Sequence, residues 1–357
     1  MSENRDILID AANRLLADHV TKPVLEQAEA GTWPAELWSA LEDNGLTLAS
    51  VPEAQGGVGG GPLDELAVLR AAGRAAAPVP LAETMLAGWL LAGASLKVPF
   101  GPLSIAPVRP GETLGLTQAD GGWLLAGKVT RIPWGAAAAH VAVLAKVGRS
   151  PHVALVPRQA WQAVAGHNLA GEPRDTLTFA GVKLAPEMVA RAGKGVDFDA
   201  LFARGALVRA AQISGALDHI LDLAVRYASE RVQFGRAIGR FQAVQQQLAV
   251  LAGHCAAAGK AVDAAYEELE QGGNADVEIA VAKARGGEAA GICAGIAQQV
   301  HGAIGFTHEH TLHYSTRRLW SWRDEFGSES HWQIRLGRRV AAAGADALWP
   351  FLTGTDT

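Results

Sequence analysis

The stretch RVQFGRAIGRFQAVQQQ, residues 231–247, lies between two long segments with helical periodicity, and the interpretation of the whole chain starts from it. Gly235 and Gly239 suit a junction between helices, because glycine adopts backbone angles that are costly for other residues. Such a junction does not require Arg231 or a run of glutamines. Arginine is suited to bidentate contact with phosphate, and glutamine offers a donor and an acceptor to a nucleotide. A basic loop between helices and a nucleotide-binding segment are both compatible with this stretch alone.

A second stretch, QQVHGAIGF at residues 298–306, favours the nucleotide-binding interpretation of the first. Together the two resemble the carboxyl-terminal domain of the acyl-CoA dehydrogenase family, in which an ERxxFG…FQ segment precedes a QxxGGxGF segment. Here ERVQFG begins at Glu230, FQ begins at Phe241 and QVHGAIGF begins at Gln299. The run Trp33–Gly59 is similar to a stretch of the family's amino-terminal domain. The two motifs occur in the same order and at a plausible separation, so the resemblance is specific.

Composition limits the class of protein. A chain of 357 residues suggests two or three domains, and 49% hydrophobic with 19% charged residues is typical of a globular protein. A net charge of −5 without a basic motif argues against nucleic-acid binding. Cys255 and Cys293 lie in alanine-rich helical patterns, which predicts buried thiols and neither a disulfide nor a metal site. Residues 2–10 lack the apolar core of a secretory signal, and no apolar run is long enough to span a bilayer. We therefore expect a cytoplasmic enzyme.

The pattern of elements predicts an α+β protein with three parts. Helical periodicity and proline starts dominate residues 1–98, which predicts an amino-terminal helical domain. Short strand-like runs separated by Gly, Pro and Asp fill residues 99–192, which predicts a small β-barrel or sandwich. Long one-face apolar stripes occupy residues 193–357, which predicts an antiparallel bundle of four or five helices. Its alanine-rich helices also favour a dimer or tetramer.

The middle part departs from the family pattern. Gly127-Lys128 resembles the start of the family's GxKxWIxNxxxA segment, but Arg131-Ile132-Pro133 stands where Trp-Ile-Thr is usual. The expected aromatic and hydroxyl contacts to a flavin are therefore missing, and Pro133 has no backbone N–H to donate. Trp134 either takes over such a contact or belongs to the core of the β-domain.

The resemblance implies an FAD-dependent acyl-CoA dehydrogenase that oxidises an acyl-CoA to the enoyl-CoA and passes electrons to an electron-transfer flavoprotein. This reaction needs a base for the α-proton and a flavin for the β-hydride, since no side chain accepts a hydride. The resemblance also implies that Arg231 contacts the FAD phosphates, with Gln233 and Phe234 beside them. It implies that Gln299 and Gly302 lie near the adenosine of the neighbouring subunit's cofactor. A homodimer, a tetramer or a heteromer with a second acyl-CoA dehydrogenase chain follows from this arrangement.

The sequence departs most from the family pattern at the position of the catalytic base. Most of the family carries a Glu directly before Gly-Thr or Gly-Ser, about twenty residues beyond the GxGF motif, and that position here is Phe326. A minority carries the base on the first long helix, where the matching position falls near Gly205, with Arg204 beside it, and offers no carboxylate. We therefore predict Glu325, one residue before Phe326, as the catalytic base, with Asp324 and Glu329 as further candidates.

Other interpretations of these residues stay open. Each candidate carboxylate could instead form an ion pair with Arg318 or Arg323. The missing Glu is also compatible with a non-catalytic subunit of a heteromeric acyl-CoA dehydrogenase, or with another flavin reaction such as an elimination or an oxygenation. The histidines within and just after the second motif match no metal-binding spacing, so no metal site is predicted; they are His301, His308, His310 and His313.

Overall fold

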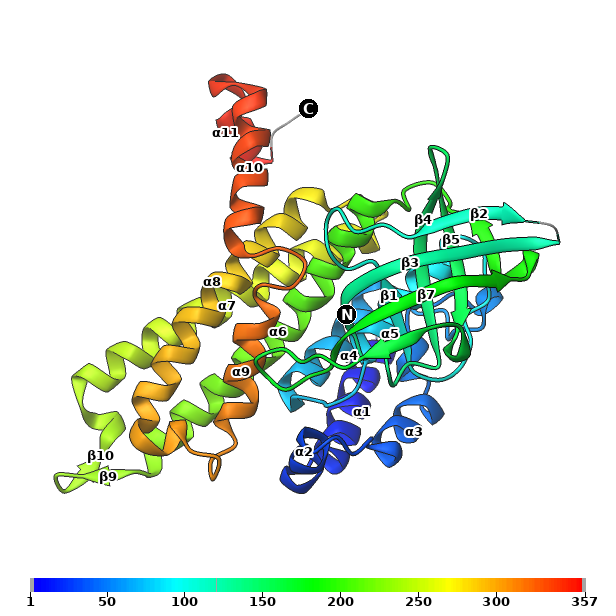
Figure 1. Ribbon diagram of the computed structural model, residues 1–357. Helices are drawn as coiled ribbons and strands as arrows, with labels where there is room; N and C mark the ends of the chain where they lie inside the picture. Colours follow the sequence, from blue (N-terminus) through cyan, green and yellow to red (C-terminus); the bar gives the residue numbers. More distant parts are fainter. Residues whose placement is uncertain (1–2, 120, 355–357) are drawn as a thin grey trace.

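Five helices form the amino-terminal part of the chain, whose computed structural model describes residues 3–119 and 121–354 (Figure 1). α4 begins at a proline, as the sequence predicts for this part, and Gly45 just after α3 is in the left-handed conformation (φ +69°). The second helix, of eight residues, was not predicted from the sequence. The helices are α1 (Glu3–His19), α2 (Lys22–Glu29), α3 (Ala35–Asp43), α4 (Pro62–Ala75) and α5 (Leu81–Ala92).

The middle of the chain is one hydrogen-bonded, eight-stranded sheet. Its order is β6-β7-β3-β2-β4-β5-β8, and β1 pairs in parallel with β4. The path is open, since its end strands β6 and β8 pair with β7 and β5. Hydrogen bonds among the described strands therefore do not close this sheet into a barrel, which was one of the two arrangements expected from the sequence. The strands are β1 (Leu103–Ala106), β2 (Gly115–Ala119), β3 (Gly122–Pro133), β4 (His140–Val147), β5 (Ser150–Pro157), β6 (Gln162–Val164), β7 (Arg174–Leu184) and β8 (Val189–Arg191).

The carboxyl-terminal part is built on three long helices that pack side by side (Figure 1). A two-stranded hairpin, β9 (Val232–Gln233) and β10 (Arg236–Ala237), joins the first two at one end of the bundle. The final helices project from the bundle as an arm (Figure 1). The helices are α6 (Phe198–Glu230), α7 (Gln242–Glu270), α8 (Asp276–His301), α9 (Leu312–Trp322), α10 (Glu329–Ala343) and α11 (Leu348–Thr353).

The three parts share one core. A single apolar cluster includes Leu16 of α1, Leu90 of α5, Leu144 of β4 and Leu207 of α6. Packing of α4 on α6 and of α5 on β1 joins the helices at the amino terminus to the other two parts. The α+β fold class is confirmed, while the exact domain boundaries at residues 98 and 192 stay predictions. Within the described ranges, no helix combines the length and apolarity needed to cross a membrane.

Candidate active site

A cleft of about 440 Å³ opens where the sheet, the start of α6 and the turn after α9 meet. A hollow of about 240 Å³ continues it along the first turns of α6. Apolar side chains form much of the wall, and Arg131 and Arg174 add positive charge on the side of the sheet. The two cavities share the residues Val108, Arg109, Pro110, Phe202, Phe326 and His331.

The turn after α9 sets the shape of this cleft. Phe326 and Gly327 both have positive φ angles, +53° and +91°, which reverse the chain before α10. The buried ammonium of Lys283, on α8, donates to the carbonyl oxygens of Arg323 and Gly327, each at 2.6 Å. Burial lowers the pKa of Lys283 to about 7, because it disfavours the charged form. Lys283 therefore fixes both ends of the turn.

Glu325, the predicted base, lies in this turn but points into a cluster of arginines. Its carboxylate accepts hydrogen bonds from Nε of Arg174 and Nε of Arg209, both at 2.7 Å, and its side chain is 12% exposed. Burial alone would raise the pKa of Glu325, but Arg174 and Arg209 outweigh it and lower the pKa to about 2. A general base works best with a pKa near the working pH, so these ion pairs argue against Glu325 as the base. Its catalytic role stays a prediction.

The cluster around Glu325 extends through all three parts of the chain. Arg209 of α6 also pairs with Glu83 of α5, and Arg174 of β7 also pairs with Glu172 at 3.0 Å. Glu172 lies 3.3 Å from Nε of Arg318 on α9. Three carboxylates and three guanidiniums therefore balance one another in a largely buried cluster, as buried charges require.

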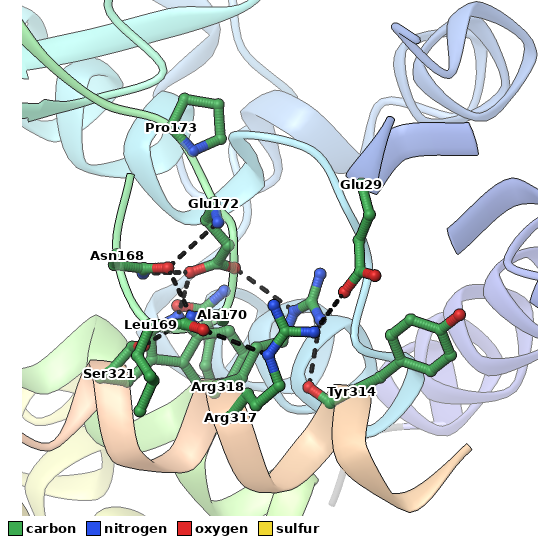
Figure 2. Close-up of polar contacts among 12 residues, drawn as sticks. Glu29, Asn168, Leu169, Ala170, Glu172, Pro173, Tyr314, Arg317, Arg318 and Ser321 are labelled. Carbon is green, nitrogen blue, oxygen red and sulfur yellow. Dashed lines mark hydrogen bonds and ion pairs between the residues drawn. The ribbon is translucent and has the colours of Figure 1, made fainter. Parts of the chain in front are cut away.

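Figure 2 shows how the loop before β7 is attached to α9. The Asn168 side-chain oxygen accepts from the backbone N–H groups of Ala170 and Glu172, both at 3.0 Å. Ala170 N–H also reaches Ser321 Oγ, and Arg317 donates to the carbonyl oxygen of Leu169 (Figure 2). These bonds hold Glu172 against Arg318 and so place the sheet relative to the turn.

Phe326 and Gly205, at or near the two positions where the resemblance predicts a base, face each other. The Phe326 ring occupies the space that a side chain at Gly205 would need, since a Cβ there would lie 2.3 Å from the ring. The ring also packs edge-to-face on Phe202, with centroids 6.0 Å apart. An apolar contact therefore joins the two positions, and a side chain added at Gly205 would clash with the Phe326 ring.

Asp324 differs from the other candidate carboxylates. It lines the cleft, its side chain is exposed, and it has no ion pair or hydrogen bond within the described residues. Glu329, in contrast, pairs with Arg323. Arg318 and Arg323 are thus partners of Glu172 and Glu329, and Asp324 is left as a free carboxylate at the cleft.

The residues predicted to contact the cofactor lie at the far end of the bundle, on the β9–β10 hairpin (Figure 1). Phe234 at its tip is 91% exposed, and its backbone is left-handed (φ +51°). Arg231 and Gln233 are exposed and make no side-chain hydrogen bond to any described residue. This arrangement leaves a guanidinium, an amide and an aromatic ring free for a ligand.

Gln299 and Gly302 lie at the end of α8, on the same end of the bundle. The stacking of Tyr227, near the end of α6, on His301, with ring centroids 4.6 Å apart, joins the two helix ends. Gln299 is exposed, and a Cβ on Gly302 would meet no atom within 4 Å. The free donors and open backbone fit the phosphates and adenine of a dinucleotide.

The β9–β10 hairpin lies at the end of the bundle away from the sheet, which forms one wall of the cleft (Figure 1). Among residues 3–119 and 121–354, no three His, Cys, Asp or Glu side chains converge as metal ligands. Cys255 and Cys293 are buried thiols, as predicted.

On the sheet, the aromatic side chain of Trp134 does not reach the cleft. It packs edge-to-face on Trp33, with centroids 6.3 Å apart, and lines a separate cavity. Arg131 and Pro133 line the cleft instead. Trp134 therefore contributes to packing against the amino-terminal part, which neither the flavin contact nor the β-domain core expected from the sequence describes.

Sequence reasoning missed three buried polar residues at the cleft. Arg174, Arg209 and Lys283 form the ion pairs and the double carbonyl contact described above. The available signal was that Arg209 and Lys283 interrupt apolar or alanine-rich faces of long helices, where an isolated cation needs a buried partner.

Comparison with known proteins gives two family matches. Residues 2–95 match the model of the acyl-CoA dehydrogenase N-terminal domain, and residues 193–326 match that of the C-terminal domain. Acyl-CoA dehydrogenase FadE27 of Mycobacterium tuberculosis is 30% identical over 344 residues, which cover 87% of this chain and 89% of the relative. Acyl-CoA dehydrogenase IpdE2 of Mycolicibacterium smegmatis is 29% identical over 330 residues, with 89% and 93% covered.

Solved structures show the same architecture. A chain of the ChsE4-ChsE5 complex from Mycobacterium tuberculosis superposes with a TM-score of 0.87 and 25% identity, covering 97% of this chain and 99% of that one. Butyryl-CoA dehydrogenase from Megasphaera elsdenii superposes with a TM-score of 0.85 at 21% identity, covering 95% and 98%. The second of these, at its low identity, supports the fold alone.

Proposed function

The chain belongs to the acyl-CoA dehydrogenase family, and we propose that it oxidises an acyl-CoA thioester to the α,β-enoyl-CoA in the cleft between its sheet and α6. FAD is its cofactor. The observation that carries the proposal for the site is the cleft itself, which combines apolar walls with one unpaired carboxylate, Asp324.

Bound FAD supplies the acceptor for the β-hydride, which the protein lacks. The chain's own residues have three tasks. Phe202, Phe326 and Pro133 exclude water from the acyl group, because they line the cleft with apolar surface. Arg131 and Arg109 bring positive charge to its wall, where the anionic parts of substrate and cofactor can approach.

A carboxylate must remove the α-proton of the thioester, and Asp324 is the candidate that is free to do so. Glu325 holds two arginines and Glu329 holds Arg323, so both would have to break ion pairs before accepting a proton. Asp324 lines the cleft without such a partner among the described residues. We therefore propose Asp324 as the base and keep Glu325 as the alternative.

The cofactor contacts predicted at the hairpin end serve a second chain. Arg231, Gln233 and Phe234 approach the phosphates of the partner's FAD, while Gln299 and Gly302 lie near its adenosine. This proposal rests on the separation of the hairpin end from the cleft and on its free donors. An electron-transfer flavoprotein is the proposed acceptor of the electrons.

A specific observation also supports a second function, that of the supporting subunit in a heteromeric acyl-CoA dehydrogenase. Phe326 and Gly205, at or near the positions where the resemblance predicts a base, touch each other, and neither carries a carboxylate. In such an assembly this chain's hairpin end would serve the cofactor of a catalytic partner. The relatives described above are named as dehydrogenases, so self-sufficient catalysis is the first proposal.

A visible absorption spectrum tests both functions. The chain is expressed alone, and the flavin band is recorded before and after anaerobic addition of a panel of acyl-CoA esters. Bleaching by an ester supports self-sufficient dehydrogenation, and Asp324→Asn should then slow it by roughly two orders of magnitude or more. Slowing in Glu325→Gln but not in Asp324→Asn would assign the base to Glu325. A yellow protein that no ester bleaches, but that bleaches once a partner chain is added, would support the second function.

A further inference from the structure

The proposed base, Asp324, is carried by the turn 323–327, and one buried side chain holds both ends of that turn. The carbonyl oxygens of Arg323 and Gly327 each accept a hydrogen bond from the Lys283 ammonium at 2.6 Å. Neither carbonyl accepts another hydrogen bond within the part of the chain that the structure describes. Without Lys283, both ends of the turn would therefore lose their partner on α8.

Lys283 is itself fixed in place. Its side chain is fully buried, and α8 packs along α6 and against α10. Because α6 contributes Phe202 to the wall of the cleft, the two hydrogen bonds from α8 hold the turn at a set place relative to that wall.

The position of Asp324 depends on the backbone of this turn alone. Its carboxylate has no ion pair or hydrogen bond within the described residues. The next two residues of the turn have further contacts: Glu325 is bound by two arginines, and Trp332 Nε1 donates to the carbonyl oxygen of Phe326 at 2.9 Å. Beside Asp324, the hydrogen bond from Lys283 to the carbonyl oxygen of Arg323 has this task.

The charge of Lys283 responds to pH near neutrality. Burial lowers the pKa of Lys283 to about 7, because the nearby carboxylates do not fully offset the loss of solvation. A charged ammonium forms stronger hydrogen bonds to carbonyl oxygens than a neutral amine does. The titratable and charged groups that face Lys283 come from the turn, α10 and α6; they are Asp324, Glu325, Glu329, His331 and Arg209.

We propose that Lys283 is the positioning residue of the reaction: it holds the turn so that the carboxylate of Asp324 stays at the cleft, where the α-proton of the thioester is removed. Lys283 acts through the backbone of the turn, since its own side chain is fully buried. The inference rests on the proposed function, in which Asp324 is the base. A displacement of about 1 Å is enough to slow a reaction roughly a hundredfold.

The test measures a single anaerobic turnover of the FAD-loaded protein by stopped-flow absorbance, with an ester that bleaches the wild-type flavin. Lys283→Met removes the ammonium and keeps a long unbranched side chain. We expect the rate constant of flavin reduction to fall at least about tenfold, while the amplitude per bound flavin and the Kd of the ester change less than about twofold. Lys183→Met, at an exposed lysine of β7 that does not line the cleft, should keep the wild-type rate constant.

The pH profile separates positioning from a general loss of structure. The wild-type rate constant should fall as the pH rises above about 7, because Lys283 loses its charge there. Lys283→Gln keeps N–H donors that do not titrate, so this fall should be absent from its profile, and from that of Lys283→Met. A general loss of structure would lower the amplitude and leave the pH dependence of the rate constant as in the wild type.

Two kinetic results overturn the proposal. One is a rate constant in Lys283→Met within about twofold of the wild type, with or without a loss of amplitude. The other is the same fall above pH 7 in Lys283→Gln as in the wild type. If Lys283→Met does not fold, Lys283→Gln carries both measurements.

Hydrogen exchange tests the inference without turnover. In Lys283→Met the amides of residues 323–328 should exchange at least about tenfold faster, while those of β7 keep their wild-type rates. Unchanged protection of the turn would contradict its attachment by Lys283. If no ester bleaches the wild-type flavin, the proposed function fails, and the exchange result still decides whether Lys283 holds the turn.

Discussion

The ring of Phe326 lies directly on Gly205: a Cβ atom built on Gly205 would come within 2.3 Å of both Cδ1 and Cε1 of that ring. Phe326 is buried, and its backbone is held in the left-handed region by the turn after α9. The glycine of α6 is thus matched to the aromatic residue of the turn.

Gly205→Ala should lower the free energy of unfolding by about 1–3 kcal/mol, because the added methyl group overpacks the contact with Phe326. Gly253→Ala is the control: this glycine is inside α7 with no atom within 4 Å of a Cβ, and alanine there should stabilise by about 0.5–1 kcal/mol. Urea unfolding measures both. The combination Gly205→Ala with Phe326→Ala should show coupling, since removing the ring relieves the clash; strictly additive effects would contradict the contact.

Glu325→Gln should lower the free energy of unfolding by about 3–5 kcal/mol at pH 7, because it leaves Arg174 and Arg209 without their shared carboxylate. The folded pKa of about 2 lies below the ordinary 4.5, so the stabilisation by Glu325 is present above pH 4.5 and is lost as the pH falls toward 2. That part of the acid dependence, about 3 kcal/mol, should be missing in the variant. Glu187→Gln, an exposed control, should follow the wild-type curve. Parallel acid curves for Glu325→Gln and wild type would show that the pairs do not form.

Lys283→Met should change how stability depends on alkaline pH. Burial lowers the pKa of Lys283 from 10.5 to about 7, so between these values the unfolded chain binds more protons than the folded one. The free energy of unfolding of the wild type should therefore rise from pH 7 to pH 9 relative to Lys283→Met, by about 1.4 kcal/mol per pH unit at most. Lys183→Met serves as the exposed control. If the free energy of unfolding of the wild type does not rise relative to that of Lys283→Met between pH 7 and pH 9, the pKa of Lys283 is not lowered.

Arg231→Ala should weaken the retention of FAD while leaving the free energy of unfolding of the apoprotein within about 0.5 kcal/mol of wild type, because the side chain is exposed and makes no hydrogen bond with the described residues. The flavin-to-protein absorbance ratio after gel filtration measures the retention. Arg226→Ala, another exposed arginine of the same helix region, should keep the wild-type ratio. Equal loss in both variants would mean that general charge, and not the hairpin end, holds the cofactor.

The sequence predicted well the elements whose signal is local. The long helices α6, α7 and α8 form the helical bundle expected within residues 193–357, and α4 has the kind of proline start expected in residues 1–98. Caps, prolines and a 3.6-residue period need only neighbouring residues, and each long helix has several turns in which to show them. The short strands β1, β6 and β8, of three or four residues, are too brief for a period to appear.

The candidate site was harder to predict from the sequence, because its interactions join residues that are far apart in the chain. Glu325 was singled out for its place beside Phe326, yet its partners Arg174 and Arg209 are 151 and 116 positions away. Nothing local distinguishes a carboxylate that will be buried between two guanidiniums from one that will face a cleft, as Asp324 does. The contact of Gly205 with Phe326 is of the same kind: the sequence lacks a carboxylate at both positions but does not show that they touch.

The buried cluster of Glu83, Arg209, Glu325 and Arg174 takes one charged residue from each of four elements: α5, α6, the turn after α9 and β7. If one of these elements came away, the remaining buried charges would lose their partner, which costs several kcal/mol. The four elements are therefore stable only together. A calorimetric scan should accordingly show a single heat-absorption peak for the whole chain, and protease nicking should release no sheet or bundle fragment that survives by itself.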